Sequence, residues 1–248
     1  MLIDRNLIWE LDPASSITPQ LTRILRERII RNDLKPGDRI SESELARAYD
    51  VSRQPIREAF IKLADQGLVE VRPQRGTFIT KINYLAVLDA RFLREAIEAD
   101  IAKILAANPD PAVIADLRQQ LALQEGIDHS DRDAFTRLDE LFHRTLAEAA
   151  GKASAWKQID GLKSQMDRVR YLSLGKIPTK ALVQQHTDIV NRIESGDVVE
   201  ANRAVRLHLR GVLNDLPKIV RANRDSFNLP DGDIPPPVNA PIQGGDEQ

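Results

Sequence analysis

Residues 17–81 constrain the fold most, because helix signals and strand signals follow one another there at short spacing. Apolar residues recur about every 3.6 positions in residues 17–32, which predicts an amphipathic helix. Ser41 with Glu44 three positions later is a capping-box pattern, so a second helix begins there. Ser52 follows the tight turn "DVS" and can cap a third helix.

The third helix, "RQPIREAFIKLADQG", ends at Gly67. Residues 68–71 and 77–79 then read as two short strands, joined by a turn over 73–76. Two helices, a tight turn, a third helix and a hairpin make a winged helix-turn-helix, so we expect a DNA-binding domain over residues 17–81.

Charge is distributed unevenly along the chain. The whole sequence has a formal net charge of −2, whereas residues 51–81 carry six basic and three acidic residues. This difference favours a small basic surface for DNA on a mildly acidic body.

Arg53 and Arg57 lie four positions apart at the start of the third helix, so both project from one face. That end of a recognition helix enters the major groove, where an arginine binds guanine or a phosphate. Ser52 and Gln54 add hydrogen-bonding groups beside them. Taken alone, two arginines are more typical of a solvated helix surface than of a DNA contact.

Beyond residue 84 the strand signals disappear, and the sequence predicts a bundle of about six helices with short loops. Aromatic residues are only 4% of the chain, so the core must be mainly aliphatic. We therefore expect a mainly α protein with an N-terminal extension, the winged helix, a helical domain that offers the larger apolar surface for dimerisation, and a disordered tail rich in Pro and Gly. Their predicted bounds are 1–16, 17–81, 84–224 and 225–248, and the six helices lie near 84–107, 111–125, 131–149, 153–174, 179–195 and 197–222.

Four histidines occur in the chain, and three of them lie inside different predicted helices, each on the side that carries core residues. These are His143, His186 and His208, while His129 lies in a polar loop and is assigned no role. Asp139 precedes His143 by four positions, one helical turn. Three inward histidines and one aspartate form a metal-ligand set of the kind found between facing helices.

The residues alone leave two interpretations of these histidines open. A single histidine on an apolar helix face is usually a hydrogen-bonded core residue. The alternative is a metal site, which must use His, Asp or Glu because the chain has no cysteine. If a metal is bound, it serves catalysis, sensing or structure, and a metalloenzyme that hydrolyses its substrate is the competing function class.

The segment "VSRQPIREAFIKLADQGLVEVRPQRGTF" resembles the DNA-binding domain of the GntR family of bacterial transcription regulators. The resemblance implies that Arg53, Arg57, Ser52 and Gln54 contact DNA. It also implies that the wing glycine, Gly76, approaches the minor groove with Arg75 beside it. Ser43 departs from relatives that have an arginine there, so an operator preference does not carry over.

Residues 84–220 resemble the all-helical FCD-type effector domain of the FadR subfamily, through "DELFH", "QHTDI" and "LHL" in that order. The resemblance implies that Asp139, His143, His186 and His208 bind a divalent cation, with zinc, nickel and manganese as candidates. It also suggests a small organic acid as effector. Gln185 replaces the acid usual beside His186, which weakens one expected outer contact.

Arg94 is a further candidate for the effector site, because its guanidinium can hold a carboxylate with two hydrogen bonds. Its alternative role is an ion pair with Glu98 four positions later. The leading interpretation is a ligand-responsive regulator, expected to be a repressor that binds a palindromic operator as a homodimer. A constitutive DNA-binding dimer with a structural metal is the third possibility.

The sequence has no apolar run of the roughly 18–20 residues needed to span a bilayer. Its N-terminal residues lack the basic start of a secretory signal. Together with the missing cysteines, this predicts a cytoplasmic protein without a membrane partner.

Overall fold

The computed structural model describes residues 10–128, 131–173, 179–231 and 234–242. The described residues form two units, one of residues up to 84 together with 223–229, and one of residues 85–222 together with those from 230 on. The fold class is the predicted one, an N-terminal winged helix-turn-helix followed by a helical domain.

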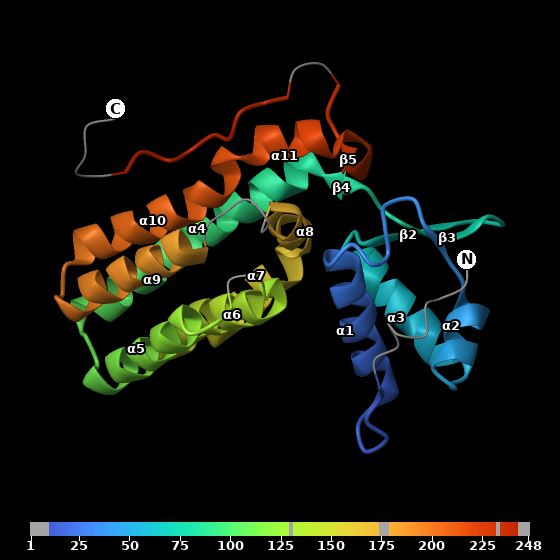
Figure 1. Cartoon of the computed structure of the whole chain (residues 1–248), viewed down its shortest axis with the longest axis horizontal. Coiled ribbons are helices and arrows are strands. Elements are labelled where there is room, and N and C mark those ends of the chain that lie inside the picture. Colours follow the sequence, from blue (N-terminus) through green and yellow to red (C-terminus); the bar gives the residue numbers. More distant parts are fainter. Residues whose placement is uncertain (1–9, 129–130, 174–178, 232–233, 243–248) are drawn as a thin grey trace. The chain divides into compact units, whose positions relative to one another are not determined.

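The winged helix is built from three helices and an antiparallel sheet of strand order β1-β3-β2. In Figure 1, α1 packs alongside α3, which carries the hairpin of β2 and β3 at its end. The bounds are α1 Ile17–Ile30, β1 Arg39–Ile40, α2 Glu42–Ala48, α3 Arg53–Asp65, β2 Val69–Arg72 and β3 Gly76–Ile79.

Local signals explain where these helices begin and end. The hydroxyl of Ser41 accepts a hydrogen bond from the backbone N–H of Glu44, which caps α2 as the sequence predicts. Asp50 takes a left-handed backbone, with φ of 52°, in the turn before α3. Ser52 occupies the N-cap position of α3 but makes no capping hydrogen bond, so its hydroxyl does not satisfy the helix end.

Two further strands belong to the first unit and were not predicted. β4 (Ile82–Asn83) pairs in parallel with β5 (Phe227–Asn228), which follows a short 3-10 helix over Arg224–Ser226. For the segment from residue 225, where composition favoured disorder, the structure gives this strand and an extended course over residues 234–242.

The helical domain contains eight helices within the described residues, where the sequence predicted about six. The predicted helices 153–174 and 197–222 are each divided in two. Pro217 accounts for the second break, because a proline ring excludes the helical hydrogen bond of its own residue and clashes with the preceding turn. The bounds are α4 Tyr84–Ala107, α5 Pro111–Glu125, α6 Arg132–Ala149, α7 Ala153–Leu162, α8 Ser164–Ser173, α9 Thr179–Glu194, α10 Val198–Asn214 and α11 Leu216–Ala222.

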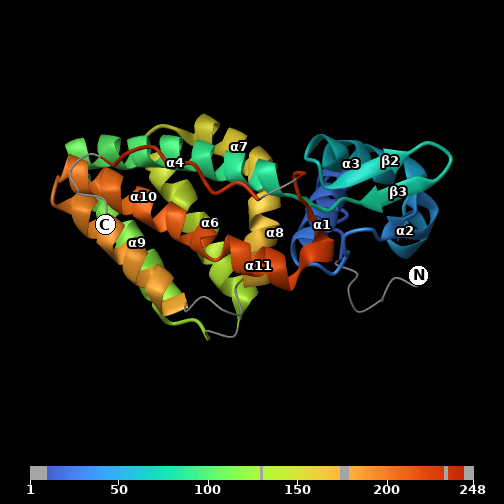
Figure 2. The same cartoon turned by 90° about the horizontal axis from the view of Figure 1, so that it is seen from above.

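Neighbouring helices in this domain pack against one another in chain order, α5 on α6 and α9 on α10, while α5 also contacts α9. Figure 2 shows α9 and α10 side by side. The core between the helices is mainly aliphatic, with Phe142 and Trp156 as the aromatic members of its largest cluster. No helix among the described residues is long and apolar enough to cross a membrane.

Candidate metal centre and nucleic-acid interface

The N-terminal end of α3 presents the polar side chains that the sequence predicts for DNA contact. Ser52, Arg53, Gln54 and Arg57 are all exposed there, while Ile56 on the opposite side is fully buried in the core. The helix is therefore fixed by its apolar face, and its polar face is open to a groove of DNA.

Arg57 is held in place by a neighbour from α2. Its Nε and Nη2 donate to the two carboxylate oxygens of Glu42 at 3.1 and 3.0 Å. This fork-to-fork pairing sets the direction of the guanidinium before any DNA is bound. Gln54 Nε2 donates to Oε1 of Glu58 at 3.1 Å, and both of these residues are exposed.

The wing places a second group of arginines beside its glycine. Gly76 has a φ of 105°, a region that only glycine enters without strain. A methyl group on Gly76 would lie 2.8 Å from Nε of Arg39, whose side chain therefore covers the glycine. Arg75 is exposed next to it, and Arg72 stacks on Phe78 and pairs with Glu70. Arg39 was not predicted, because only the pairing of β1 with β3 brings it to the wing.

The helical domain brings together the three histidines and the aspartate that lie far apart in sequence. Asp139 and His143 come from α6, His186 from α9 and His208 from α10. All four are buried, with 0–2% of their surface exposed. One possible ligand atom from each residue lies within 4.8 Å of those of the others.

The three imidazole rings point the same nitrogen at one another. Nε2 of His208 lies 3.2 Å from Nε2 of His143 and 3.3 Å from Nε2 of His186. Two nitrogens bound to one ion at about 2.1 Å would be roughly 3.0–3.4 Å apart, so these spacings suit a shared ion. Oδ1 of Asp139 lies 3.6 Å from Nε2 of His186 and 4.0 Å from that of His143.

The other ring nitrogen, Nδ1, faces an oxygen acceptor in every case. Glu98 Oε2 lies 2.7 Å from His143 Nδ1, Gln124 Oε1 lies 2.8 Å from His186 Nδ1, and Gln185 Oε1 lies 2.9 Å from His208 Nδ1. A proton on each Nδ1 satisfies all three oxygens and leaves three Nε2 lone pairs facing each other. Lone pairs at that spacing repel, and a cation between them removes the repulsion.

Charge states at this centre also suit a cation. Burial lowers the pKa of His186 to about 3 and that of His208 well below its ordinary value, which keeps both rings neutral. Burial raises the pKa of Asp139, but the charge of Arg170, 2.8 Å away, outweighs it and keeps this pKa well below the ordinary value. Neutral imidazoles and an ionised carboxylate are the forms that bind metals.

Arg94 lies in the same centre but makes the contact that was its alternative role. It is 3% exposed, and its Nε lies 2.5 Å from Oε1 of Glu98. Burial raises the pKa of Glu98, but the charge of Arg94 lowers it to about 2. The buried carboxylate of Glu98 therefore lies between Arg94 and His143 and contacts both.

Sequence reasoning missed part of this outer group. Gln185 replaces the usual acid next to His186 in the sequence, and its side-chain oxygen lies 2.9 Å from Nδ1 of His208, because successive residues on a helix point in different directions. Gln124 was not predicted at all. Its signal is a fully buried glutamine on a helix face that otherwise carries Leu117 and Leu121. His129, which was assigned no role, lies outside the described residues.

These features define a class of protein. A winged helix with an arginine-rich recognition helix, followed by an all-helical domain with a buried ligand set, is a two-domain DNA-binding transcription regulator. Residues 18–79 match the gntR family of bacterial regulatory proteins, and residues 89–211 match the FCD domain. The chain belongs to the GntR family, as the resemblance implied, and is a transcription regulator and not an enzyme.

Known proteins agree over most of the chain. It is 37% identical over 221 residues to the HTH-type transcriptional repressor RspR of Escherichia coli K12, covering 88% of this chain and 97% of that protein. It is 38% identical over 212 residues to a transcriptional regulator of Streptomyces ambofaciens, covering 85% and 89%. The solved structure of E. coli McbR/YncC shares the fold with a TM-score of 0.70 at 17% identity, covering 84% and 99%.

Proposed function

We propose that this protein is a repressor that binds operator DNA as a homodimer and responds to a small organic acid through a metal ion in its helical domain. The observation that carries the proposal is the convergence of three Nε2 atoms and Asp139 at one buried point of a DNA-binding regulator. Each part of the proposal has its own support in the molecule.

Repression is supported by relatives. RspR is named a repressor, and so is a probable D-xylose utilization operon repressor that is 28% identical over 200 residues. The proposed DNA contacts on α3 are Ser52, Arg53, Gln54 and Arg57, whose polar side chains are exposed at the helix end that enters the major groove. On the wing they are the exposed Arg75 and the neighbouring Gly76, whose backbone would approach the minor groove. One such domain offers few base contacts, so a homodimer on a palindromic operator is proposed.

The metal part rests on the donor set and its surroundings. Asp139, His143, His186 and His208 would hold a divalent cation such as zinc, nickel or manganese, with their outer nitrogens already oriented by oxygen acceptors. The ion would act as a Lewis acid that attracts a carboxylate. Arg94 pairs with Glu98, which contacts His143, and this pairing would hold its guanidinium in position to share that carboxylate.

Effector binding would shift the packing of the helices that carry these ligands. Couplings between two sites are typically about 1–3 kcal/mol, which changes operator affinity roughly 5- to 150-fold. Full burial of the four ligands is also compatible with a structural metal that no effector reaches. The two possibilities differ in whether a small acid changes DNA binding.

Fluorescence anisotropy with DNA from upstream of its own gene tests the proposal. The protein is loaded with Zn²⁺, Ni²⁺ or Mn²⁺, and a panel of organic acids is added. Saturable operator binding that weakens with one acid only in the metal-loaded protein supports it. Operator binding that no acid alters, with a metal that only raises the melting temperature, would instead establish the structural metal. Failure to bind any upstream DNA would overturn the proposal.

A further inference from the structure

A second buried charged cluster lies on α4 and α10 and includes none of the proposed metal ligands. Glu95 is 2% exposed and forms ion pairs with Arg91 from its own helix and with Arg206 and Arg210 from α10. Nη1 of Arg206 lies 2.9 Å from Oε1 of Glu95, and Nε of Arg210 lies 3.1 Å from both carboxylate oxygens. Three guanidinium groups around one carboxylate leave an excess of positive charge that other acceptors must meet.

The C-terminal segment supplies those acceptors through its main chain. Nη2 of Arg91 donates to the carbonyl oxygen of Val238 at 3.0 Å, and Nη2 of Arg210 donates to the carbonyl oxygen of Ala240. The two carbonyls are two residues apart, and in an extended chain such carbonyls point to the same side. The side chain of Val238 is 82% exposed, so the segment is held by its backbone and not by that side chain.

The composition of the segment suits this role. Pro235, Pro236 and Pro237 precede the first carbonyl and keep the chain extended, which reduces the entropy lost on docking. Figure 2 shows the segment lying along α10 and α4. It lies beyond residue 211, where the match to the FCD domain ends.

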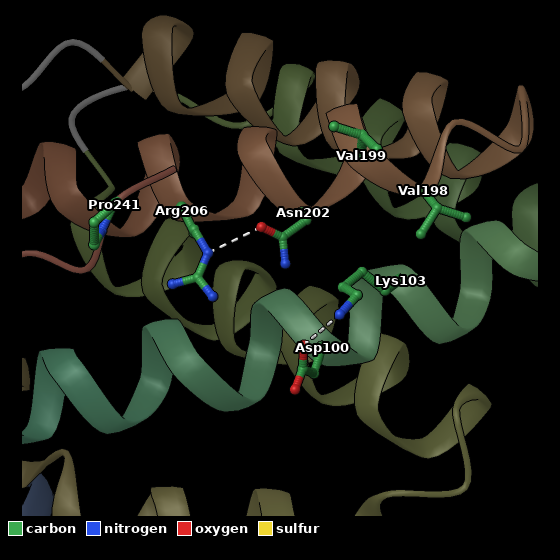
Figure 3. A pocket seen from close by; sticks show the side chains of 7 residues that line it. All are labelled: Asp100, Lys103, Val198, Val199, Asn202, Arg206 and Pro241. Atoms are coloured by element: carbon green, nitrogen blue, oxygen red, sulfur yellow. Dashed lines mark hydrogen bonds and ion pairs between the residues drawn. The ribbon is translucent and has the colours of Figure 1, made fainter. Parts of the chain in front are cut away.

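A cavity lies between the two helices beside Pro241 of the segment. Asp100 and Lys103 of α4, Val198, Val199, Asn202 and Arg206 of α10, and Pro241 line a cavity of about 250 Å³. Figure 3 shows Arg206 reaching Asn202 and Lys103 reaching Asp100, so these polar groups bind one another. The guanidinium bridge to Glu95 joins α4 and α10 in addition to the apolar core that both helices share.

These two helices also carry the outer and inner groups of the proposed metal centre. Glu98, which contacts His143, lies one turn after Glu95 on α4. His208 lies between Arg206 and Arg210 on α10. A segment that fixes the arginine cluster therefore also fixes the separation of Glu98 and His208.

We propose that residues 234–242 are a strap. They dock on the α4–α10 face as an extended peptide recognised through its carbonyl oxygens, and docking holds both helices in the arrangement that binds metal. The second half of this inference rests on the proposed metal site, whereas the docking itself does not. The face is a receptor for an extended, proline-rich peptide whose occupant is this chain's own tail.

The strap is tested in the full chain with a nitroxide label. The sequence has no cysteine, so Val238→Cys creates a single labelling position on an exposed side chain. Electron paramagnetic resonance should show a restricted label in the parent. Arg210→Gln should free it, and so should replacement of Pro235, Pro236 and Pro237 by glycine, which alters no helix residue. Arg203→Gln, the same change on α10 at an arginine that pairs with Glu200, is the matched control and should leave the label restricted.

Zn²⁺ affinity of the same variants, measured by competition with a chelator, tests the coupling. Arg210→Gln and the triple glycine variant should bind Zn²⁺ roughly 3- to 10-fold more weakly, less than the 10- to 100-fold typical of losing a direct outer partner. Arg203→Gln should match the parent. A label as mobile in the parent as in the variants overturns the docking, and freed labels with unchanged Zn²⁺ affinity overturn the coupling. A parent that binds no Zn²⁺ overturns the metal site while leaving the label result to decide the docking.

Discussion

The proposed DNA-binding face and the proposed metal centre use polar side chains in opposite surroundings. Arg57 on α3 is 59% exposed and pairs with a half-buried Glu42, whereas Asp139 and the three histidines are 0–2% exposed and pair with buried or partly buried partners. An exposed side chain can rearrange around a lost neighbour at small cost, but a buried one cannot. Substitutions should therefore have graded effects on the first region and abrupt effects on the second.

The largest effect is expected from His143→Ala. It removes one of three nitrogen ligands and leaves the carboxylate of Glu98 buried without its contact on this side. Zn²⁺ affinity should fall by more than about 100-fold, beyond the range for an outer partner. Chelator competition measures it, with His129→Ala as the histidine control. Retention of parental affinity in His143→Ala would remove the four-ligand assignment.

Arg53→Ala should have the next largest effect, on the other region. Arg53 is exposed at the start of α3, and a base or phosphate contact by arginine supports roughly a 10- to 100-fold gain in operator affinity. Zn²⁺ affinity should stay at the parental value. Fluorescence anisotropy measures operator affinity and chelator competition measures Zn²⁺ affinity, with Arg23→Ala on the exposed side of α1 as the control. Equal losses of operator affinity in Arg53→Ala and Arg23→Ala would mean that charge alone, and not the α3 surface, determines DNA binding.

Gln124→Leu tests the outer group of the metal centre. The oxygen of Gln124 accepts from Nδ1 of His186, so its loss frees the ring tautomer and should weaken Zn²⁺ binding by about 10-fold. Gln120→Leu is matched, because Gln120 is also buried on α5 but bonds to Thr145 instead. If the two variants bind Zn²⁺ equally, the orienting role of Gln124 is wrong.

The smallest effect is expected from Glu42→Gln. The change removes a negative charge from beside Arg57, a proposed DNA contact, and keeps a hydrogen-bond acceptor. Operator affinity should rise by about 2- to 3-fold, since exposed pairs are weak and the DNA is a polyanion. Titrations at several salt concentrations measure this. Glu27→Gln, in the exposed pair with Arg23, should show no change, and a loss of affinity in Glu42→Gln would show that orientation outweighs charge.

How far the sequence predicted each region follows from how local its signals are. Residues close together in sequence, such as Ser41 with Glu44 and Gly67 after α3, determine where the elements of the winged helix begin and end, so most of these elements could be predicted. Arg39 could not, because strand pairing alone carries it to Gly76. The missing information was the contact between Arg39 and Gly76, which are distant in sequence.

The metal centre shows the same division more sharply. Periodicity placed the three histidines on inward helix faces, and this placement needs only their own helices. Their outer partners depend on which helices face each other, so neither Gln124 nor the contact of Gln185 with His208 was predicted. The break before Pro217 was not predicted for a different reason, because the apolar repeat of residues 197–222 continues through the proline and favours one uninterrupted helix.

The parallel pairing of β4 with β5 has a consequence for building hybrid regulators. The DNA-binding unit is not a contiguous piece of chain, because it includes residues 223–229 from the far side of the helical domain, with Phe227 only 3% exposed. A hybrid that joins residues 1–84 to a foreign sensor would lack that strand and its aromatic side chain. A hybrid should therefore replace residues 85–222, which form the helical domain, and retain both residues 1–84 and residues 223–229.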